Sequence, residues 1–351
     1  MGNGRYISIC ILFAAGVCHA LETDQFTLPP RPLVDIGPEL QQEVTAALQR
    51  AMDRANGQYA EHMANARRTG FDFIRQSELE KANQRLTEGF MARAVFDATV
   101  RGGSAVCYME GWARYGEFDR QPMKFDPSPG ESVYDTLTRP ILIFILSPTI
   151  SLDGVYLGTD KLGHIFEQGY EYYEVYARER NRGRDEAAAI RKAVELGVEQ
   201  EQGVYGLGID NIYSNADLAA NYAGLKFYIN LTRPVAINGI KREPILVLEN
   251  KQWRLNKAAG DNFMRAYITA HLNEAWNPCR YDWPLRLGVR SNVRKLAPRW
   301  MEHNGITAEE LRQRMVELSR WYGEDYGHSG FEKVVGLVEI QNSTDLASSQ
   351  K

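Results

Sequence analysis

Residues 214–230 read SNADLAANYAGLKFYIN, and this stretch favours a mainly helical fold because alanine, leucine and other helix-forming residues dominate it. Ser214 followed three residues later by Asp217 is typical of a helix N-terminus. At about 100° per residue, Asp217 and Asn221 lie at the centre of a face with apolar flanks, and Lys226 lies opposite. Because a buried carboxylate needs a cation, a metal or several hydrogen bonds, this face is a candidate site. Alternatively, Asp217 only caps the helix, which leaves Asn221 unexplained.

The flanking sequence predicts further helices. Their apolar residues recur at helical spacing over 38–67, 77–100, 159–180, 185–202, 261–276 and 307–322. The first two segments suit an N-terminal helical hairpin, and Thr307 with Glu310 forms a capping-box pattern. A strand-like pattern occurs between 237 and 255, where we expect at most one short β-hairpin. The predicted fold class is therefore mainly α, with one multi-helix, bundle-like domain.

The composition divides the chain into four segments. We expect a signal peptide at 1–20, an N-terminal helical region at 21–120, a main helical domain carrying the site at 121–335, and a flexible tail at 336–351. The boundary near 121 follows from a stretch that contains proline and glycine, and the tail is rich in Ser, Gln and Asn.

The first twenty residues have the order of a signal peptide. Arg5 supplies a positive charge, an apolar run follows from Ile7 to Val17, and Ala20 is a small residue at the expected cleavage site. This predicts a secreted or periplasmic protein cut near Ala20. Lipoprotein anchoring through Cys18 is the alternative, although Val17 is bulky for a lipidation signal. No later apolar run is long enough to cross a membrane, so we expect no transmembrane segment after signal removal.

Net charge and cysteine content give two further expectations, one about partners and one about disulfide bonding. The formal net charge of −4 gives no reason to expect a nucleic acid partner. After cleavage near Ala20 only Cys107 and Cys279 remain, so they are the candidate pair for a disulfide in an oxidising compartment. Two separate buried thiols are the alternative.

Two other helices carry candidate polar groups. Asp160 and His164 begin a stripe of polar residues along 159–180, which is either a solvated face or, at its N-terminal end, the lining of a cleft. Glu201 falls on the apolar face of 185–202, or else lies in a fraying last turn that reaches water. His271 and Glu274 have the spacing of a ligand pair, but such pairs usually lie on a surface.

Taken together, these motifs resemble the VanZ-like and YfiM-like bacterial envelope protein families. Asp160-Lys-Leu-Gly-His164 looks like their Asp-Lys-x-x-His helix start, and Asp217, Asn221 and Gly224 match their Asp-x-x-x-Asn-x-x-Gly helix, with Glu201 between. The resemblance covers about residues 158–229, and the chain is too polar for the multi-span VanZ-like pattern. It implies a role near a cell-wall glycan or lipid-linked envelope substrate, and it adds Lys161 and Gly224 to the candidate residues.

Two functions are compatible with these residues. The first is a hydrolase of a cell-wall glycan or lipid-linked envelope substrate, whose catalytic candidates are Asp160, His164, Glu201, Asp217 and Asn221. In it Glu201 is a general acid, Asp217 its ionised partner and His164 a base or orienting group. No cofactor is predicted, although Asp160, His164 and Asp217 could hold a divalent metal. The second is a non-enzymatic binding or structural protein of the periplasm, in which the polar cluster is a satisfied core network.

Overall fold

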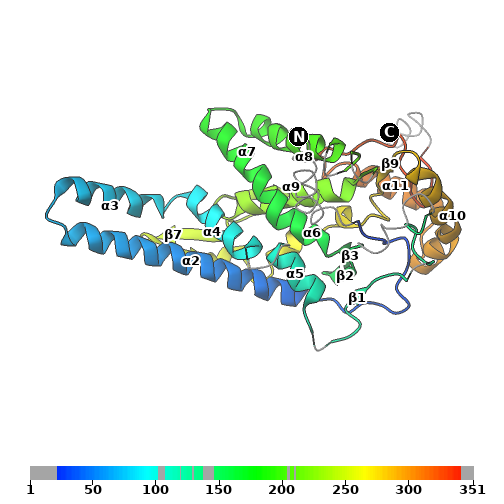
Figure 1. Ribbon diagram of the computed structural model, residues 1–351, viewed down its shortest axis with the longest axis horizontal. Helices are drawn as coiled ribbons and strands as arrows, with labels where there is room; N and C mark the ends of the chain where they lie inside the picture. The colour runs from blue at the N-terminus through cyan, green and yellow to red at the C-terminus, as the bar shows by residue number, and fades with distance from the viewer. Residues whose placement is uncertain are drawn as a thin grey trace, which may run out of the picture.

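The computed structural model describes residues 22–101, 107–118, 120–128, 130–136, 146–203, 206–208 and 211–340. The predicted signal peptide at 1–20 lies outside the described residues. Figure 1 shows an elongated molecule, with α2 (Gly37–Arg68) and α3 (Asp72–Gln84) at one end and α10 (Leu285–Asn304) and α11 (Ala308–Leu318) at the other. The molecule is mainly α-helical, as the sequence predicts.

The N-terminal helices pack around α2. Helix α3 and helix α4 (Glu88–Val100) both lie against it, and α5 (Tyr108–Tyr115) follows. The sequence predicts one helix over 77–100, whereas the chain forms two that are separated at residues 85–87. Thr87 caps the start of α4 by accepting a hydrogen bond from the amide of Phe90, and this cap explains the break.

Three segments predicted as helices form the centre of the molecule. The first is a continuous rod of α6 (Asp160–Gly163), a π-helical turn (His164–Gln168) and α7 (Gly169–Asn181). The second and third are α8 (Glu186–Gln202) and α9 (Asn215–Asn230). Helix α9 is buried along its whole length and packs against both α7 and the π-helical turn. Helix α9 is therefore the buried central helix of this group.

Glycines permit this close packing of α9. A Cβ atom on Gly224 would lie 2.1 Å from the carbonyl oxygen of Ile165, and one on Gly169 would lie 2.6 Å from the Cα of Gly224. Both distances are far below ordinary van der Waals contact, so the two helix backbones could not approach this closely with larger residues. The role of Gly224 is therefore steric.

The β structure is more extensive than predicted. A three-stranded antiparallel sheet contains β1 (Lys124–Phe125), β2 (Thr149–Leu152) and β3 (Val155–Gly158), and β4 (Ile212–Tyr213) pairs with β9 (Arg280–Tyr281). Two further hairpins are β5 (Val235–Ile237) with β6 (Ile240–Arg242), and β7 (Leu246–Glu249) with β8 (Gln252–Leu255). The expectation of at most one hairpin near 237–255 is wrong.

Tight turns explain the additional hairpins. The residue pairs 153–154, 238–239 and 250–251 each connect two strands, and both residues of each pair have positive φ. Turns of this kind match the twist of paired strands, and Asn, Asp and Gly are the residues that adopt them most readily. The Asp153-Gly154 and Asn238-Gly239 pairs are thus sequence signals for separate hairpins.

The segment 261–276 is not the helix that the sequence predicts. It contains two short 3₁₀ turns, Met264–Ala266 and Ala270–Leu272, joined by irregular chain. Asn273 accepts hydrogen bonds from the amides of Ala275 and Trp276, and such side-chain bonds compete with helix formation.

The C-terminal region has its own apolar core. Helix α10, which the spacing analysis did not predict, packs in this core with α11, and the predicted capping box at Thr307 and Glu310 is present. Leu337 and Val338 are buried there, so residues 336–340 are not the start of a flexible tail. Residues 341–351 lie outside the described residues.

A larger apolar cluster extends from Ile36 in the N-terminal region to Tyr326 near the C-terminal end. It therefore continues across the expected boundary between 120 and 121. Within the described parts of the chain, no helix combines the length and apolar character needed to cross a membrane.

Candidate functional site

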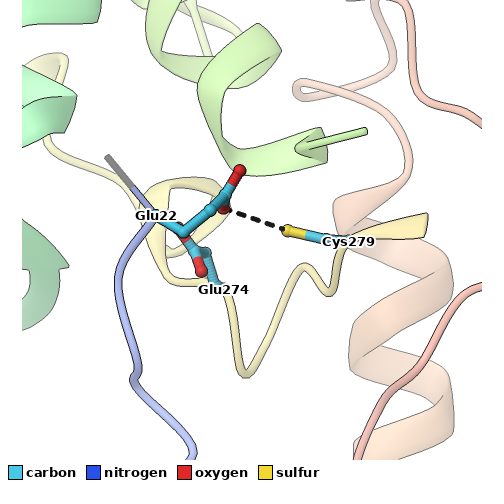
Figure 2. A group of neighbouring side chains, drawn as sticks. All are labelled: Glu22, Glu274 and Cys279. Carbon is cyan, nitrogen blue, oxygen red and sulfur yellow. Dashed lines mark hydrogen bonds between the residues drawn. The ribbon is translucent and has the colours of Figure 1, made fainter. Parts of the chain in front are cut away.

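The first described residues of the chain run into the interior beside the loop after the second 3₁₀ turn. Glu22 lies close to Glu274 and to the buried Cys279, whose thiol points at a Glu22 carboxylate oxygen 4.0 Å away (Figure 2). The next residue, Thr23, is buried and its amide points at Glu274 Oε1 (3.3 Å). The start of the described chain (residues 22–25) and the distant 273–279 loop therefore meet at a group of acidic side chains.

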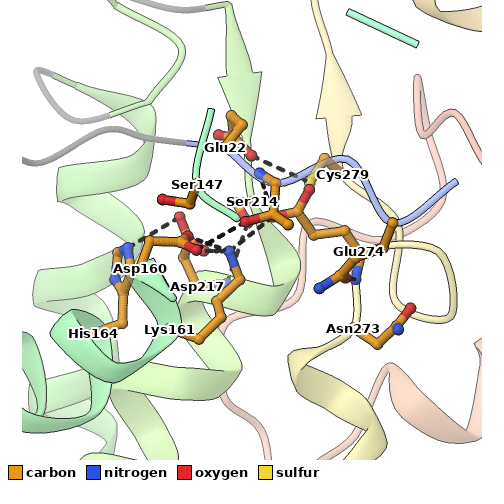
Figure 3. A network of polar contacts seen from close by, with 12 residues as sticks. Glu22, Ser147, Asp160, Lys161, His164, Ser214, Asp217, Asn273, Glu274 and Cys279 are labelled. Carbon is orange, nitrogen blue, oxygen red and sulfur yellow. Dashed lines mark hydrogen bonds and ion pairs between the residues drawn. The ribbon is translucent and has the colours of Figure 1, made fainter. Parts of the chain in front are cut away.

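Lys161 is the centre of the polar cluster. Its side chain is completely buried, and its Nζ lies 2.6 Å from Asp160 Oδ2, 2.6 Å from Asp217 Oδ1 and 2.7 Å from Glu274 Oε1 (Figure 3). These three carboxylates come from α6, α9 and the 273–279 loop. Burial alone would lower the pKa of Lys161, but the carboxylates outweigh it and raise that pKa well above its usual value. A permanent cation thus joins three parts of the chain.

Neighbouring hydroxyl groups donate to two of these carboxylates, those of Asp160 and Glu274. The hydroxyl of Thr23 donates to Asp160 Oδ1 (2.8 Å), and the hydroxyl of Tyr134 lies 3.4 Å from Glu274 Oε2. The backbone amide of Glu274 donates to the side-chain oxygen of Gln25. Gly158 makes room for the Thr23 contact, since a Cβ there would lie 1.8 Å from the Thr23 hydroxyl.

His164 joins the cluster at its more exposed edge. Its Nε2 lies 3.2 Å from Asp217 Oδ2, and its Nδ1 lies 2.9 Å from the amide oxygen of Asn221. Both partners are acceptors, so they favour a ring protonated at both nitrogens. Burial opposes the charge, but Asp217 outweighs it and raises the pKa of His164 to about 9. The side chains of His164 and Asp217 each keep 11 % of their surface exposed.

Asp217 therefore lies between two cations. Burial would raise its pKa, but His164 and Lys161 outweigh burial and hold the pKa of Asp217 below its usual value. Its backbone amide also donates to the hydroxyl of Ser214 (3.2 Å), the N-cap of α9. Ser214 alone thus caps the helix, and the Asp217 carboxylate is directed into the cluster.

Glu201 has a different environment. It is the penultimate residue of α8, it is buried, and one carboxyl oxygen accepts a hydrogen bond from the amide of Ser214 (3.1 Å). No ion pair to Glu201 occurs among the described residues. Burial, followed by repulsion from Asp217, raises the pKa of Glu201 to about 8. The carboxyl is therefore mostly protonated near neutral pH, and the fraying-turn alternative is wrong.

The pKa values of Glu22, at the start of the described chain, and of its neighbour Glu274 are also raised. Burial, followed by the negative charge of Glu274, raises the pKa of Glu22 well above its usual value. Burial raises the pKa of Glu274 to about 7, because Lys161 only partly offsets it. The cluster thus combines a strongly ionised acid, Asp217, with acids whose pKa values are raised.

The two candidate disulfide cysteines do not pair. Both are buried free thiols, and they pack in different apolar clusters. The Cys107 thiol lies 3.6 Å from the carbonyl oxygen of Thr99, whereas Cys279 faces Glu22. This arrangement agrees with the alternative of two separate thiols.

Among the described residues, two groups of side chains could hold a metal ion: Asp160 with His164 and Asp217, and Glu22 with Glu274 and Cys279. Lys161 already occupies the space between the carboxylates of Asp160 and Asp217, and it binds Glu274 as well. A divalent cation in either group would be repelled by this ammonium. The donor set therefore suits a resident lysine better than a metal.

The site agrees in large part with the sequence-based candidates. The predicted residues Asp160, His164, Asp217 and Asn221 lie together, and Glu201 approaches them through the N-cap of α9. His271 is not part of the site, since its nitrogens contact Thr269 and the carbonyl of Arg320.

The residues that the pattern analysis missed are Glu22, Thr23, Tyr134 and, as a member of this site, Glu274. Glu274 was expected on a helix surface, yet it is completely buried. A detectable signal was the accumulation of polar residues around it in the sequence Asn273-Glu-Ala-Trp-Asn277. Lys161 was indicated only by the family resemblance.

Comparisons of the chain with protein-family models, curated proteins and solved structures found no match for any part of it.

Proposed function

We propose that this chain is an exported hydrolase that acts on a cell-wall glycan or a lipid-linked envelope substrate. Glu201 serves as the proton donor, Asp217 as the ionised carboxylate that accepts a proton from water, and His164 as the residue that positions Asp217. Export rests on the signal-peptide pattern of residues 1–20, and the substrate class rests on the resemblance to YfiM-like envelope proteins.

The observation that carries the proposal is that two neighbouring carboxyl groups have pKa values shifted in opposite directions. Asp217 contacts both Lys161 and His164, whereas the hydrogen bond to Glu201 comes from a neutral backbone amide. These surroundings lower the pKa of Asp217 and raise that of Glu201 to about 8. A protonated acid beside an ionised one is the arrangement that hydrolytic acid–base chemistry needs.

Each remaining group has a supporting role in this mechanism. Lys161 keeps Asp217 ionised through its contact with Oδ1, and the ring of His164 fixes the other oxygen. Asn221 orients that ring by accepting a hydrogen bond at Nδ1. The raised pKa of His164, about 9, makes it a poor base at neutral pH, so its role is orientation.

A direct test is incubation of the mature protein with purified cell-wall sacculi and with lipid extracts, followed by mass spectrometry of released fragments. The wild type should release soluble fragments from at least one preparation, and Asp217→Asn should not. Absence of product from the wild type on every preparation would overturn the proposal. N-terminal sequencing of the exported protein should begin at Leu21.

One observation favours the alternative of a non-enzymatic envelope protein. Lys161 is completely shielded, and its contacts join α6, α9 and the 273–279 loop. In that case the cluster is a core network that holds these segments together. Asp217→Ala would then lower the unfolding temperature strongly, and no envelope preparation would be turned over.

A further inference from the structure

The hairpin of α2 and α3 extends beyond the large apolar cluster. The last residue of α2 in that cluster is Ala55, although the helix continues for more than three further turns. In the described stretch 56–84, only Ala66 and Ala82 are buried. Figure 1 shows this hairpin projecting at the end of the molecule that lies away from α10. Its end, residues 67–75, is called the arm tip below.

Large apolar side chains are exposed at the arm tip. Phe71, Phe73 and Ile74 expose 72 %, 86 % and 46 % of their surface. The turn that carries them is ordered, because the amide of Phe71 donates to the Thr69 hydroxyl (3.2 Å) and Arg75 donates to the Thr69 carbonyl (3.3 Å). Adjacent exposed apolar side chains of this size are typical of a surface that binds a partner.

The arm tip is also basic. It contains Arg67, Arg68 and Arg75 against the single acid Asp72, so its formal charge is +2, whereas that of the whole chain is −4. Arg75 is paired with Asp72 at 2.8 Å. In the part of the chain that the structure describes, no ion pair involves Arg67 or Arg68, and both are exposed. A local positive charge on an acidic protein attracts an anionic partner.

The small size of the apolar surface favours a lipid surface over a protein partner. Three side chains of this size bury roughly 600 Å² at most. A stable protein interface buries about 800 Å² on each partner. A membrane surface needs only that apolar side chains enter the boundary between headgroups and acyl chains, while basic side chains stay at the lipid phosphates. Guanidinium groups bind phosphate oxygens in a bidentate manner, which suits the two unpaired arginines.

We propose that the arm tip docks the protein on a membrane that contains anionic phospholipid. Phe71, Phe73 and Ile74 enter the boundary between headgroups and acyl chains, and Arg67 and Arg68 bind lipid phosphates. No residue of the Lys161 cluster belongs to the arm tip. Docking does not require the proposed hydrolase activity, so either proposal can fail without the other.

The test is co-sedimentation with lipid vesicles of protein purified without residues 1–20, whose apolar run could itself bind lipid. The wild type should bind vesicles of equal parts phosphatidylcholine and phosphatidylglycerol at least about tenfold more tightly than phosphatidylcholine alone, because anionic lipid attracts the arginines. Phe71→Ser combined with Phe73→Ser should weaken binding to the mixed vesicles at least about tenfold, since two apolar side chains no longer leave water. Because both residues are exposed, the unfolding temperature should not fall.

A second variant tests the charge separately. Arg67→Gln combined with Arg68→Gln should weaken binding to the mixed vesicles about tenfold and leave binding to phosphatidylcholine unchanged. Leu287→Ser is the matched control, because Leu287 is 63 % exposed but lies on α10 at the other end of the molecule (Figure 1). It should bind the mixed vesicles as the wild type does.

Three results would overturn membrane docking by the arm tip. The wild type does not sediment with the mixed vesicles, the double phenylalanine variant binds them as tightly as the wild type, or Leu287→Ser loses as much binding as that variant. Sedimentation velocity without vesicles tests the other occupant, a second copy of the chain. The wild type should be a monomer, and a dimer that the double phenylalanine variant dissociates would also overturn the proposal.

Discussion

Replacement of Lys161 by methionine should be among the most destabilising single changes in this protein. The substitution preserves most of the side-chain volume and removes one buried positive charge. Three carboxylates that lie within 2.7 Å of the ammonium then lose their common cation. Removal of one partner of a buried ion pair costs about 3–5 kcal/mol, and the three contacts place Lys161→Met at the upper end.

The assay is urea-induced unfolding followed by circular dichroism at pH 7. Lys192→Met is a suitable control, because Lys192 also lies 2.7 Å from a carboxylate, that of Glu195, but both side chains are more than half exposed. The control should lose little or no stability, because water screens an exposed ion pair.

Two additional measurements separate charge from packing. The loss in Lys161→Met should be smaller at pH 5 than at pH 8, because the unpaired carboxylates can take up protons in acid. Adding Glu274→Gln should restore part of the stability, since one buried negative charge is removed. A loss in Lys161→Met no larger than in Lys192→Met, at both pH values, would refute the reasoning.

Three further predictions concern titration, packing and metal content. Glu201 has a pKa of about 8 in the folded protein, against an ordinary glutamate value of 4.5. The folded state therefore binds more protons between these two values, and stability falls as the pH rises through that window. Glu201→Gln should make that fall shallower in unfolding curves between pH 5 and 8, and an unchanged slope would contradict the assignment. Gly224→Ala should cost about 1–3 kcal/mol in the same assay, because its Cβ would meet the Ile165 carbonyl at 2.1 Å, whereas Gly57→Ala in open space should gain up to about 1 kcal/mol. Elemental analysis should find less than one metal ion per chain, and EDTA should leave the unfolding temperature unchanged; a stoichiometric metal whose removal lowers that temperature would show that Lys161 does not exclude it.

The sequence predicted the central helices well because their signals are local. Ser214 and Thr307 cap the helices where the capping patterns place them. The inward direction of Asp217 and Asn221 also followed from helical spacing. What spacing could not show is that α9 is buried on every side, so that Lys226, on the opposite face, is buried as well and pairs with Glu324. A helix in the middle of a core has no solvent face to predict.

The rest of the site depends on contacts between distant parts of the chain. Glu274 lies 113 residues from Lys161, and Thr23 lies 137 residues from Asp160. No periodicity links such pairs, and the predicted helix at 261–276 placed Glu274 on a surface. The Asn273 side chain instead bonds to nearby amides and to the carbonyl of Tyr156, which keeps this loop irregular and turns Glu274 inward.

The most direct test of the proposed chemistry is the rate of product release by Glu201→Gln. Glutamine retains an acceptor for the amide of Ser214, so the variant should fold with wild-type stability or better at pH 8, but it cannot donate a carboxylic proton. Loss of a general acid costs about 10²–10⁴-fold in rate, and we predict a fall of at least about 100-fold on an envelope substrate that the wild type cleaves. A rate equal to that of the wild type would contradict the account.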